Sequence, residues 1–276
     1  MYKVSIIMPA LNEEKNIDQA LSNVISSFDR LNISGEIVVI NDGSTDGTQA
    51  AVNRWMKERP YIRVIRHETP QGIGASFWDG VLSANGEIVT MMPGDGENDS
   101  YEILRYLPLM EQLDLVVPYV YNTEVRSGFR FLLSRAYTWI MNLSFGLEIH
   151  YYNGTALYRR SVLKDIKLTS SGFFYAAELL IKAIHRGYLY AEVPYALLAR
   201  AGGTSKAVTL KSLIAVTRGY LSTLASVCLA GDPNGVLNPD SMTALRRREL
   251  SNPAALHGFC GSKEPKDTLT AHDSGG

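Results

Sequence analysis

The first part of the chain alternates short apolar, β-branched runs with longer stretches in which apolar residues recur every three or four positions. The apolar runs predict strands, and the stretches between them predict helices. The predicted strands are 3–9 (KVSIIMP), 36–42 (EIVVIND), 62–68 (IRVIRHE), 87–93 (EIVTMMP) and 113–120 (LDLVVPYV). Because helices separate successive strands, we expect right-handed βαβ units. The predicted fold class is α/β, with a mainly parallel central sheet flanked by helices.

Polar residues at the ends of these strands predict where the helices begin. A helix is predicted over 12–28, with Asn12 as its N-cap. A second is predicted over 45–58, capped by Thr45 or Asp46. Asparagine, threonine and aspartate are preferred at this position because their side chains accept a hydrogen bond from the first free N–H groups of the helix.

From about Thr123 the pattern changes, and the strands no longer alternate regularly with helices. The predicted elements are an aromatic-rich amphipathic helix over 126–146, a short strand pair over 153–163, a helix over 174–187 and a strand over 189–199. After Asp232 the chain is rich in Pro, Asn, Gly, Ser and charge and has no periodicity. We therefore expect a largely disordered tail over 232–276.

These patterns predict one α/β domain of roughly 200 residues or more, followed by an amphipathic helix over 207–231. The stretch Ser212–Ala230 is the most apolar segment, but Arg218 interrupts it. A spanning helix needs about 20 predominantly apolar residues, so a buried or interfacial helix is favoured. A membrane-associated role for this helix remains open.

Composition narrows the class of protein. The chain has 276 residues, 46% of them hydrophobic, and a formal net charge of −1. That balance gives no basic face, so nucleic acid is not an expected partner. The two cysteines show no metal or disulfide spacing, and no secretory signal is recognisable. We therefore expect a cytoplasmic protein, with a peripheral position at the cytoplasmic face of the membrane as the alternative that 207–231 suggests.

Candidate chemistry gathers where the predicted parallel strands end, since ligands of open α/β sheets bind at that edge. The polar residues there are Asn12 and Glu13 after the first strand, Asn41 and Asp42 after the second, and Asp95, Glu97 and Asp99 after the fourth. Carboxylates at one edge repel each other unless something positive lies between them. A hard divalent cation, Mg²⁺ or Mn²⁺, suits such oxygen ligands. Taken singly, Asp42, Asp46 and Asp99 are equally compatible with ordinary turn or cap residues.

The segments VSIIMPALNEEKNI and VVINDGSTDGT resemble the opening of family 2 glycosyltransferases, which have the GT-A fold and use nucleotide-activated sugars. The segment PQGIGASFWDGVLSANGEIVTMMPGDGEND follows at the family's spacing, with its glycine-rich turn and acidic strand end. The resemblance covers about 1–206. It implies a nucleotide-sugar half over 1–120 and an acceptor half over 121–206.

The resemblance also implies which residues hold the donor. Those of the first loop, the second strand end and the two glycine-bearing turns are Pro9, Ala10, Leu11, Glu13, Asp42, Gly72 and Gly94. Asp42 is expected to contact the base or ribose. The turn departs from the family at Pro70, where asparagine is usual, and at Ile73, where a basic residue is usual. The base specificity is therefore not inherited from the resemblance.

The strand end PGDGE corresponds to the family's metal-binding aspartate–x–aspartate, which the polyprenyl-phosphate branch usually follows with glutamine. Asp95 occupies the position of the second aspartate of this motif, and Glu97 occupies the position of the glutamine. Pro93 replaces the first aspartate and has no group that can bind a metal. We expect Asp95 and Glu97 to bind the metal, with Glu97 restoring the lost charge.

The acceptor half lacks the glutamate–aspartate pair with which many family members supply a general base. The nearest candidate base is Glu178. A phosphate acceptor needs no base but needs cations to position it. Candidate groups are Ser134 and Arg135, Arg159 and Arg160, and Arg200, Ser205 and Lys206. This pattern resembles the dolichyl- and polyprenyl-phosphate sugar synthases, in which an arginine, a glycine and a serine–lysine pair face the donor diphosphate and acceptor phosphate.

The function expected from this resemblance is inverting transfer of a sugar from a UDP- or GDP-linked donor to a lipid phosphate, by direct attack on the anomeric carbon. Asp95 with its metal, Arg200 and Lys206 are the expected catalytic groups, stabilising the leaving diphosphate. Three alternatives were weighed. They are transfer to a glycan or protein hydroxyl, a non-catalytic nucleotide-sugar-binding protein, and a dinucleotide-dependent oxidoreductase. The last is set aside because no GxGxxG follows the first strand.

Overall fold

A computed structural model describes residues 2–122, 128–170, 172–196, 210–229 and 237–251. The predicted site residues Arg200, Ser205 and Lys206 lie outside these ranges. The elements of the first half are β1 (Val4–Ala10), α1 (Ile17–Leu31), β2 (Gly35–Asp42), α2 (Thr48–Glu58), β3 (Ile62–His67), α3 (Ile73–Ser83) and β4 (Ile88–Met91). All four strands lie where the apolar runs predicted them.

The second half is less regular. Its elements are α4 (Ser100–Leu104), a 3₁₀ turn (Leu107–Glu111), β5 (Leu115–Val120), α5 (Gly128–Phe145), β6 (Leu157–Arg159), α6 (Arg160–Lys164), α7 (Tyr175–His185), β7 (Tyr190–Tyr195), α8 (Leu210–Leu224), a π-helical segment (Ala225–Leu229) and α9 (Met242–Ser251). No helix in the described part of the chain is long and apolar enough to cross a membrane.

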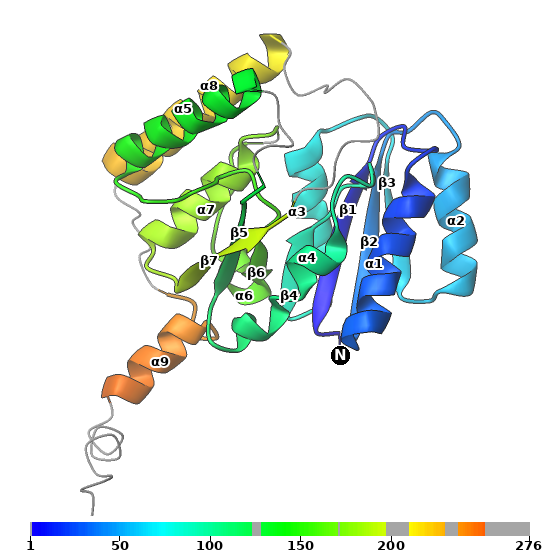
Figure 1. The fold of residues 1–276 in the computed structure, drawn as a ribbon, viewed down its shortest axis with the longest axis horizontal. Coiled ribbons are helices and arrows are strands. Elements are labelled where there is room, and N and C mark those ends of the chain that lie inside the picture. The colour runs from blue at the N-terminus through cyan, green and yellow to red at the C-terminus, as the bar shows by residue number, and fades with distance from the viewer. Residues whose placement is uncertain (1, 123–127, 171, 197–209, 230–236, 252–276) are drawn as a thin grey trace, which may run out of the picture.

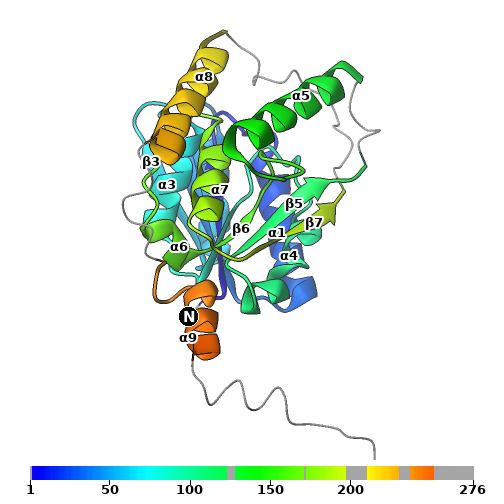
Figure 2. The same ribbon diagram turned by 90° about the vertical axis from the view of Figure 1, so that its left-hand side faces the viewer.

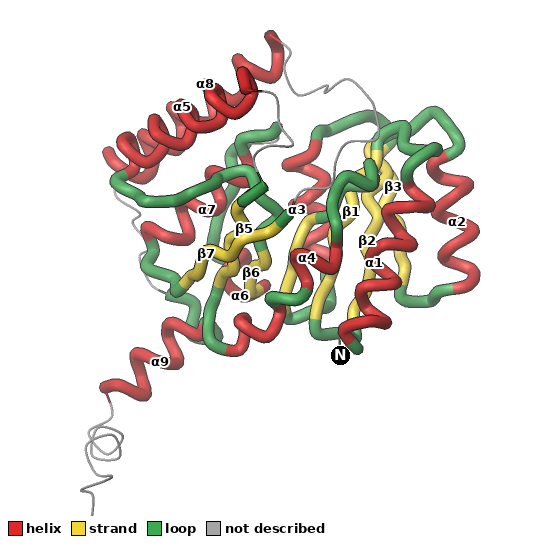
Figure 3. Tube along the Cα trace, in the orientation of Figure 1, coloured by secondary structure: helices red, strands yellow, loops and turns green. Residues whose placement is uncertain are grey.

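The strands form one seven-stranded sheet in the order β3-β2-β1-β4-β6-β5-β7 (Figures 1 and 3). Only β6 runs antiparallel to its neighbours, so the predicted mainly parallel sheet is confirmed. The chain builds β2 and β3 on one side of β1 and then returns to place β4 on the other. This reversal makes the carboxyl ends of β1 and β4 the switch point, where ligands of such sheets bind.

Each face of the sheet is covered by its own hydrophobic layer. On β1, Ile6 and Met8 pack with α1, α2 and α4, whereas Ile7 packs with α3, α5 and α7 on the opposite face. This alternation follows from the two-residue period of a strand. It shows in Figure 1 as helices on both sides of the sheet.

The first helix begins later than predicted. Asn16, not Asn12, precedes α1, and Asn12 has a left-handed backbone with φ of 58°. Asparagine tolerates this conformation better than most residues. For the second helix, Asp46 fulfils the predicted role in part, since its Oδ1 accepts from the N–H of Thr48, 3.0 Å away, although Gly47 is the residue at the cap.

The predicted strand pair over 153–163 is wrong. The chain forms the short strand β6 and then turns directly into α6. Arg159 is buried, with 6% of its surface exposed, and bonds to the Glu87 carboxylate and the Met110 carbonyl. Because β6 is antiparallel, Arg159 lies at the amino edge of the other strands and cannot position an acceptor at their carboxyl edge. Arg160 donates to the carbonyl of Ala84 at the same edge.

The predicted disorder over 232–276 is wrong for residues 237–251, which include α9. The buried Asp114 carboxylate accepts from the N–H of Met242 (2.7 Å) and of Thr243 (3.0 Å), and also from the Thr243 hydroxyl. A distant carboxylate therefore caps this helix. In both views α9 lies at the end of the molecule opposite α5 and α8 (Figures 1 and 2).

We predict that Asp114→Asn loosens α9. The amide keeps one acceptor oxygen, so a bond to α9 is lost and Arg159 loses one of its two carboxylate partners, the other being Glu87. The free energy of unfolding should fall by about 1–3 kcal/mol. Urea denaturation and amide hydrogen exchange in 242–251 measure both effects. Asp240→Asn, an exposed neighbour of α9, is the control; unchanged exchange in Asp114→Asn would contradict the capping role.

Candidate active site

Two loops at the carboxyl edge, those after β1 and β2, are bonded to each other. The N–H of Asn12 donates to Ser44 Oγ (3.0 Å), and the N–H of Thr45 donates back to Asn12 Oδ1 (2.9 Å). The N–H of Glu13 donates to Thr48 Oγ1 (2.9 Å). Each loop therefore fixes the backbone of the other. The two sequence motifs of the nucleotide half are one structural unit.

The end of β4 packs directly against the end of β1. The N–H of Gly94 donates to the carbonyl of Pro9 (2.9 Å). A Cβ on Gly94 would lie 2.8 Å from Ile17 Cδ1 and 3.2 Å from Ala10 Cβ, so a larger residue would force the strand ends apart. Of the predicted donor residues, Pro9, Ala10 and Gly94 are thus brought together at the switch point. Leu11 beside them is 37% exposed.

The acidic strand end forms a tight turn beyond Gly94. Asp95 is half-buried, and its Oδ1 accepts from the N–H of Glu97, 3.1 Å away. Gly96 between them has a φ of 72°, a conformation in which glycine is strongly favoured. The backbone thus places both residues on one turn.

The carboxylate pair fits a magnesium-type site only with the substrate's help. Among the residues that the structure describes, no group of three or more His, Cys, Asp or Glu side chains could hold a metal. Mg²⁺ is often held by one or two carboxylates, with waters and substrate phosphates completing its shell. Asp95 and Glu97 match that donor set. Pro93 itself supplies no side-chain ligand for a metal.

Asp42 at the end of β2 is nearly buried, and its carboxylate is used by the protein itself. Oδ1 accepts from the N–H of Gln71 (2.8 Å) and Oδ2 from the N–H of Gly72 (2.9 Å). The His67 ring nitrogen Nδ1 lies 2.6 Å from Oδ1. Burial alone raises the pKa of the Asp42 carboxyl, but these hydrogen bonds and the nearby His67 outweigh it, so the pKa is lowered.

The glycine-rich turn is therefore held to β2. Gly72 has a φ of 97° and precedes α3, so its N–H bond to Asp42 fixes the start of that helix. Gly43 has a φ of 76°, and a Cβ there would lie 2.8 Å from Pro70 Cδ. Pro70, a departure from the family pattern, fills the space beside Gly43.

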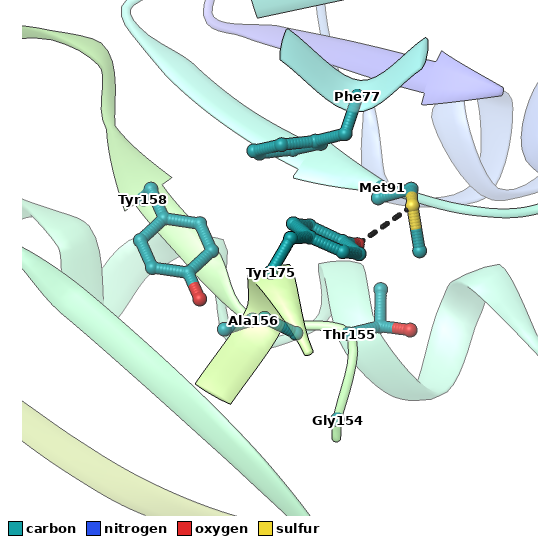
Figure 4. A pocket seen from close by; sticks show the side chains of 8 residues that line it. Phe77, Met91, Gly154, Thr155, Ala156, Tyr158 and Tyr175 are labelled. Atoms are coloured by element: carbon teal, nitrogen blue, oxygen red, sulfur yellow. Dashed lines mark hydrogen bonds between the residues drawn. The ribbon is translucent and has the colours of Figure 1, made fainter. Parts of the chain in front are cut away.

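In the second half, α7 begins beside the end of β4. Figure 4 shows the Tyr175 ring next to Phe77, with its hydroxyl directed at Met91. The ring centroids are 5.1 Å apart, and the hydroxyl donates to Met91 Sδ at 2.8 Å. Burial raises the pKa of Tyr175 well above its ordinary value, which keeps this hydroxyl a donor. The pocket around these residues has a volume of about 10 Å³, roughly one water, so it cannot hold a sugar.

Glu178, the nearest base candidate that the sequence offered in this half, is fully buried. Its carboxylate accepts from the Thr169 N–H and hydroxyl, the Ser170 N–H and Lys182 Nζ, at 2.6–2.9 Å. Burial alone raises the pKa of Glu178, but the hydrogen bond and charge of Lys182 and the two loop N–H groups outweigh it and lower the pKa. A buried carboxylate with four donors and a lowered pKa is poorly suited to take a proton from an acceptor.

The sequence of residues 5–167 matches the family described as Glycosyl transferase family 2, over more than half of the chain. The chain belongs to this family. A dodecaprenyl-phosphate galacturonate synthase of Rhizobium johnstonii is 25% identical over 170 residues, covering 60% of this chain and 50% of that protein. A polyprenol monophosphomannose synthase of Mycolicibacterium smegmatis is 28% identical over 214 residues, covering 73% and 79%.

A third relative, a dolichyl-phosphate beta-glucosyltransferase of Trichomonas vaginalis, is 36% identical over 108 residues, covering 37% of this chain and 33% of that protein. The matched part thus spans only half of the length of the Rhizobium johnstonii protein and a third of the length of the Trichomonas vaginalis protein. Among solved structures, glucosyl-3-phosphoglycerate synthase of Mycobacterium tuberculosis, in complex with Mn²⁺, UDP-glucose and phosphoglyceric acid, has a TM-score of 0.60. It is 22% identical, and the match covers 82% of this chain and 80% of that one. This likeness supports the GT-A-type α/β fold.

Sequence reasoning missed two residues of the site and left others unplaced. His67 and Asp79 contact each other beneath the glycine-rich turn, yet they are 12 positions apart and carry no motif. The position of His67 at the last residue of β3 was the one available signal. Ser134 is half-buried and Arg135 is exposed on α5.

We predict that Glu178→Gln lowers stability near neutral pH by about 1–3 kcal/mol, because the amide loses the ionic bond to Lys182. Since the folded state lowers the pKa of Glu178 below its ordinary 4.5, this contribution is complete above that pH. The contribution is lost as the pH falls through the lowered pKa, because Glu178 of the wild type then becomes protonated and is neutral, as the glutamine is. Urea denaturation of both proteins across this pH range measures the difference in their free energies of unfolding. A difference that stays constant down to the lowest pH would contradict the prediction.

Proposed function

We propose that the protein transfers a sugar, with inversion, from a nucleoside-diphosphate sugar to a polyprenyl phosphate. The carrying observation is the state of Glu178. With its carboxylate used by four internal donors, the acceptor half offers no base at the predicted position. A phosphate acceptor is already ionised near neutral pH and does not need one. The names of two relatives that act on dodecaprenyl or dolichyl phosphate support the same acceptor class.

The donor would lie over the switch point between β1 and β4. The interlocked loops of Asn12 and Ser44 and the turn of Gly72 form the rigid wall of this site. Asp95 and Glu97 lie at its edge and would hold a divalent metal, Mg²⁺ or Mn²⁺. When bound, such a metal offsets the charge that develops on the leaving diphosphate. The residues of the chain orient the donor so that the acceptor oxygen attacks the anomeric carbon in line.

Cations of the acceptor half would position the acceptor phosphate. Arg135 is exposed on α5, which carries no acidic residue. Arg200 and Lys206, two further cations predicted for this role, lie outside the described residues. Charge-assisted bonds from such cations fix a phosphate without moving a proton.

The outer faces of α5 and α8 support a position at a membrane surface. Large apolar side chains that are about half or more exposed are Leu132, Leu133, Trp139, Ile140, Leu143, Leu213, Ile214 and Leu221. Neither helix contains Asp or Glu, and Arg135 and Arg218 are exposed on them. An apolar surface with basic residues binds an anionic lipid surface. We propose that this surface, the α5–α8 face, lies on the cytoplasmic leaflet and gives access to the lipid acceptor.

The first test is a donor screen. The protein is incubated with UDP- and GDP-sugars, Mg²⁺ or Mn²⁺ and a polyprenyl phosphate, and lipid-linked sugar is measured. Asp95→Asn and removal of the metal with a chelator should each lower kcat/KM by about 100-fold or more. Glu97→Gln should cost less than Asp95→Asn if Glu97 only supplements the charge. Glu178→Gln should retain transfer.

The same screen separates the alternatives. Loss of all transfer in Glu178→Gln, with folding intact, would favour a hydroxyl acceptor and a general base. Binding of nucleotide without a metal and without donor turnover would favour a non-catalytic nucleotide-sugar-binding protein, which Pro93 at the metal position suggests.

The second test concerns the α5–α8 face. Trp139→Glu together with Leu221→Glu should abolish binding to vesicles of anionic phospholipid, since each places a charge on an exposed apolar surface. Co-sedimentation with vesicles of anionic or neutral lipid measures this. Leu82→Glu is the matched control, because Leu82 is 70% exposed on a different helix, α3. Equal binding of the double variant and wild type would contradict the membrane role.

A further inference from the structure

His67 is a buried side chain held between two carboxylates at the carboxyl edge of the sheet. Its Nδ1 lies 2.6 Å from Asp42 Oδ1 and its Nε2 lies 3.0 Å from Asp79 Oδ2. Only 7% of its surface is exposed. The ring therefore joins three elements, namely β3, which carries it, β2 through Asp42, and α3 through Asp79.

Both ring nitrogens face a carboxylate oxygen. A neutral imidazole has one N–H and one acceptor nitrogen, so one of its nitrogens would face a carboxylate oxygen without a proton between them. The imidazolium carries an N–H on both nitrogens and satisfies both carboxylates. The charged groups facing the ring are Asp42 from β2 and Asp79 from α3; no other charged side chain contacts it among the residues that the structure describes.

The position of Asp42 depends on this ring. The same carboxylate oxygen that contacts His67 accepts the N–H of Gln71, and its other oxygen accepts the N–H of Gly72. His67 thus acts through Asp42 on the turn that begins α3. Pro70 of this turn packs against Gly43 of the β2 loop, so a shift of the turn would move both walls of the donor site.

The charge of the ring also matters for an anionic ligand. The glycine-rich turn has Ile73 where a basic residue would offset charge. Without the imidazolium, Asp42 and Asp79 would be uncompensated carboxylates beside a site for a diphosphate. The ring therefore does two things at once, fixing the turn and balancing the charge beneath it.

We propose that His67 is a positioning residue for the donor, and that its imidazolium makes the affinity for a nucleoside diphosphate depend on pH. This inference rests on the proposed function, because it assumes that the donor binds over the turn of Gly72. It adds a residue and a pH response to that function. As the pH rises and the ring loses its second proton, one carboxylate contact is lost and the affinity falls.

The test is calorimetric titration of the full chain with UDP and, separately, GDP, each with MgCl₂, from about pH 6 to about pH 8.5. Wild type should bind one of them more weakly as the pH rises. His67→Gln should bind about 10-fold more weakly at the low end and show a flat pH profile. In the transfer assay, its KM for the donor should rise more than its kcat falls.

Two further variants keep the inference testable. In Asp79→Asn the amide can pair with a neutral imidazole, so the contact no longer requires a charged ring. This variant should therefore flatten the pH profile of binding. It tests the inference even if His67→Gln does not fold. His150→Gln is the matched control. That ring also contacts a carboxylate, with Nδ1 2.8 Å from Glu192 Oε2, but it is exposed and belongs to the second half. The affinity of His150→Gln for the nucleotide, and the pH profile of that affinity, should equal those of wild type.

The outcomes are distinguishable. If wild type binds neither UDP nor GDP, the proposed donor class is wrong. If wild type binds, and folded His67→Gln binds with the same affinity and pH profile, His67 is only a packing residue and this inference is overturned. An unchanged pH profile in Asp79→Asn overturns the charge argument in the same way.

Discussion

Backbone N–H groups at the carboxyl edge need acceptors, and the loops that form the candidate site depend on meeting that need. An N–H group that is buried without an acceptor is costly. Side chains of the motifs supply the acceptors. Ser44 and Thr48 accept from the first loop, Asp42 from the glycine-rich turn and Asp95 from its own turn. The site walls are therefore built by hydrogen bonds from polar side chains to backbone.

This constraint changes how the motif residues are understood. Asp42 was expected to contact the base or ribose, and that remains a prediction, but its main partners are internal. Its effect on a donor can therefore be indirect, through the turn. The same holds for Asn12, which orders the second loop instead of capping α1. Polar residues at a strand end can shape a site without touching the ligand, so a motif alone does not separate the two roles.

Periodicity predicted most of the fold because, in the first half, the apolar residues that recur at the period of each strand or helix form its buried face. It failed where the stabilising partner is remote in sequence. The α9 helix depends on Asp114, 128 positions before Met242, and the burial of Arg159 depends on Glu87, 72 positions away. His67 was not identified from the sequence for the same reason, since its contacts form only when β2, β3 and α3 lie side by side. The acidic turn of Asp95 was predictable because its spacing is local.

The two halves meet different physical demands, and this explains their different sequences. On the proposed function, the donor half must hold a multiply charged diphosphate in a fixed place, which calls for rigid loops and balanced carboxylates. The acceptor half, on the proposed function, must admit a phosphate attached to a long apolar chain. Helices without acidic residues and with exposed Leu143 and Leu221 suit that purpose. On that function a base would add little, because the oxygen of a phosphate acceptor is already ionised, and Glu178 holds a loop instead.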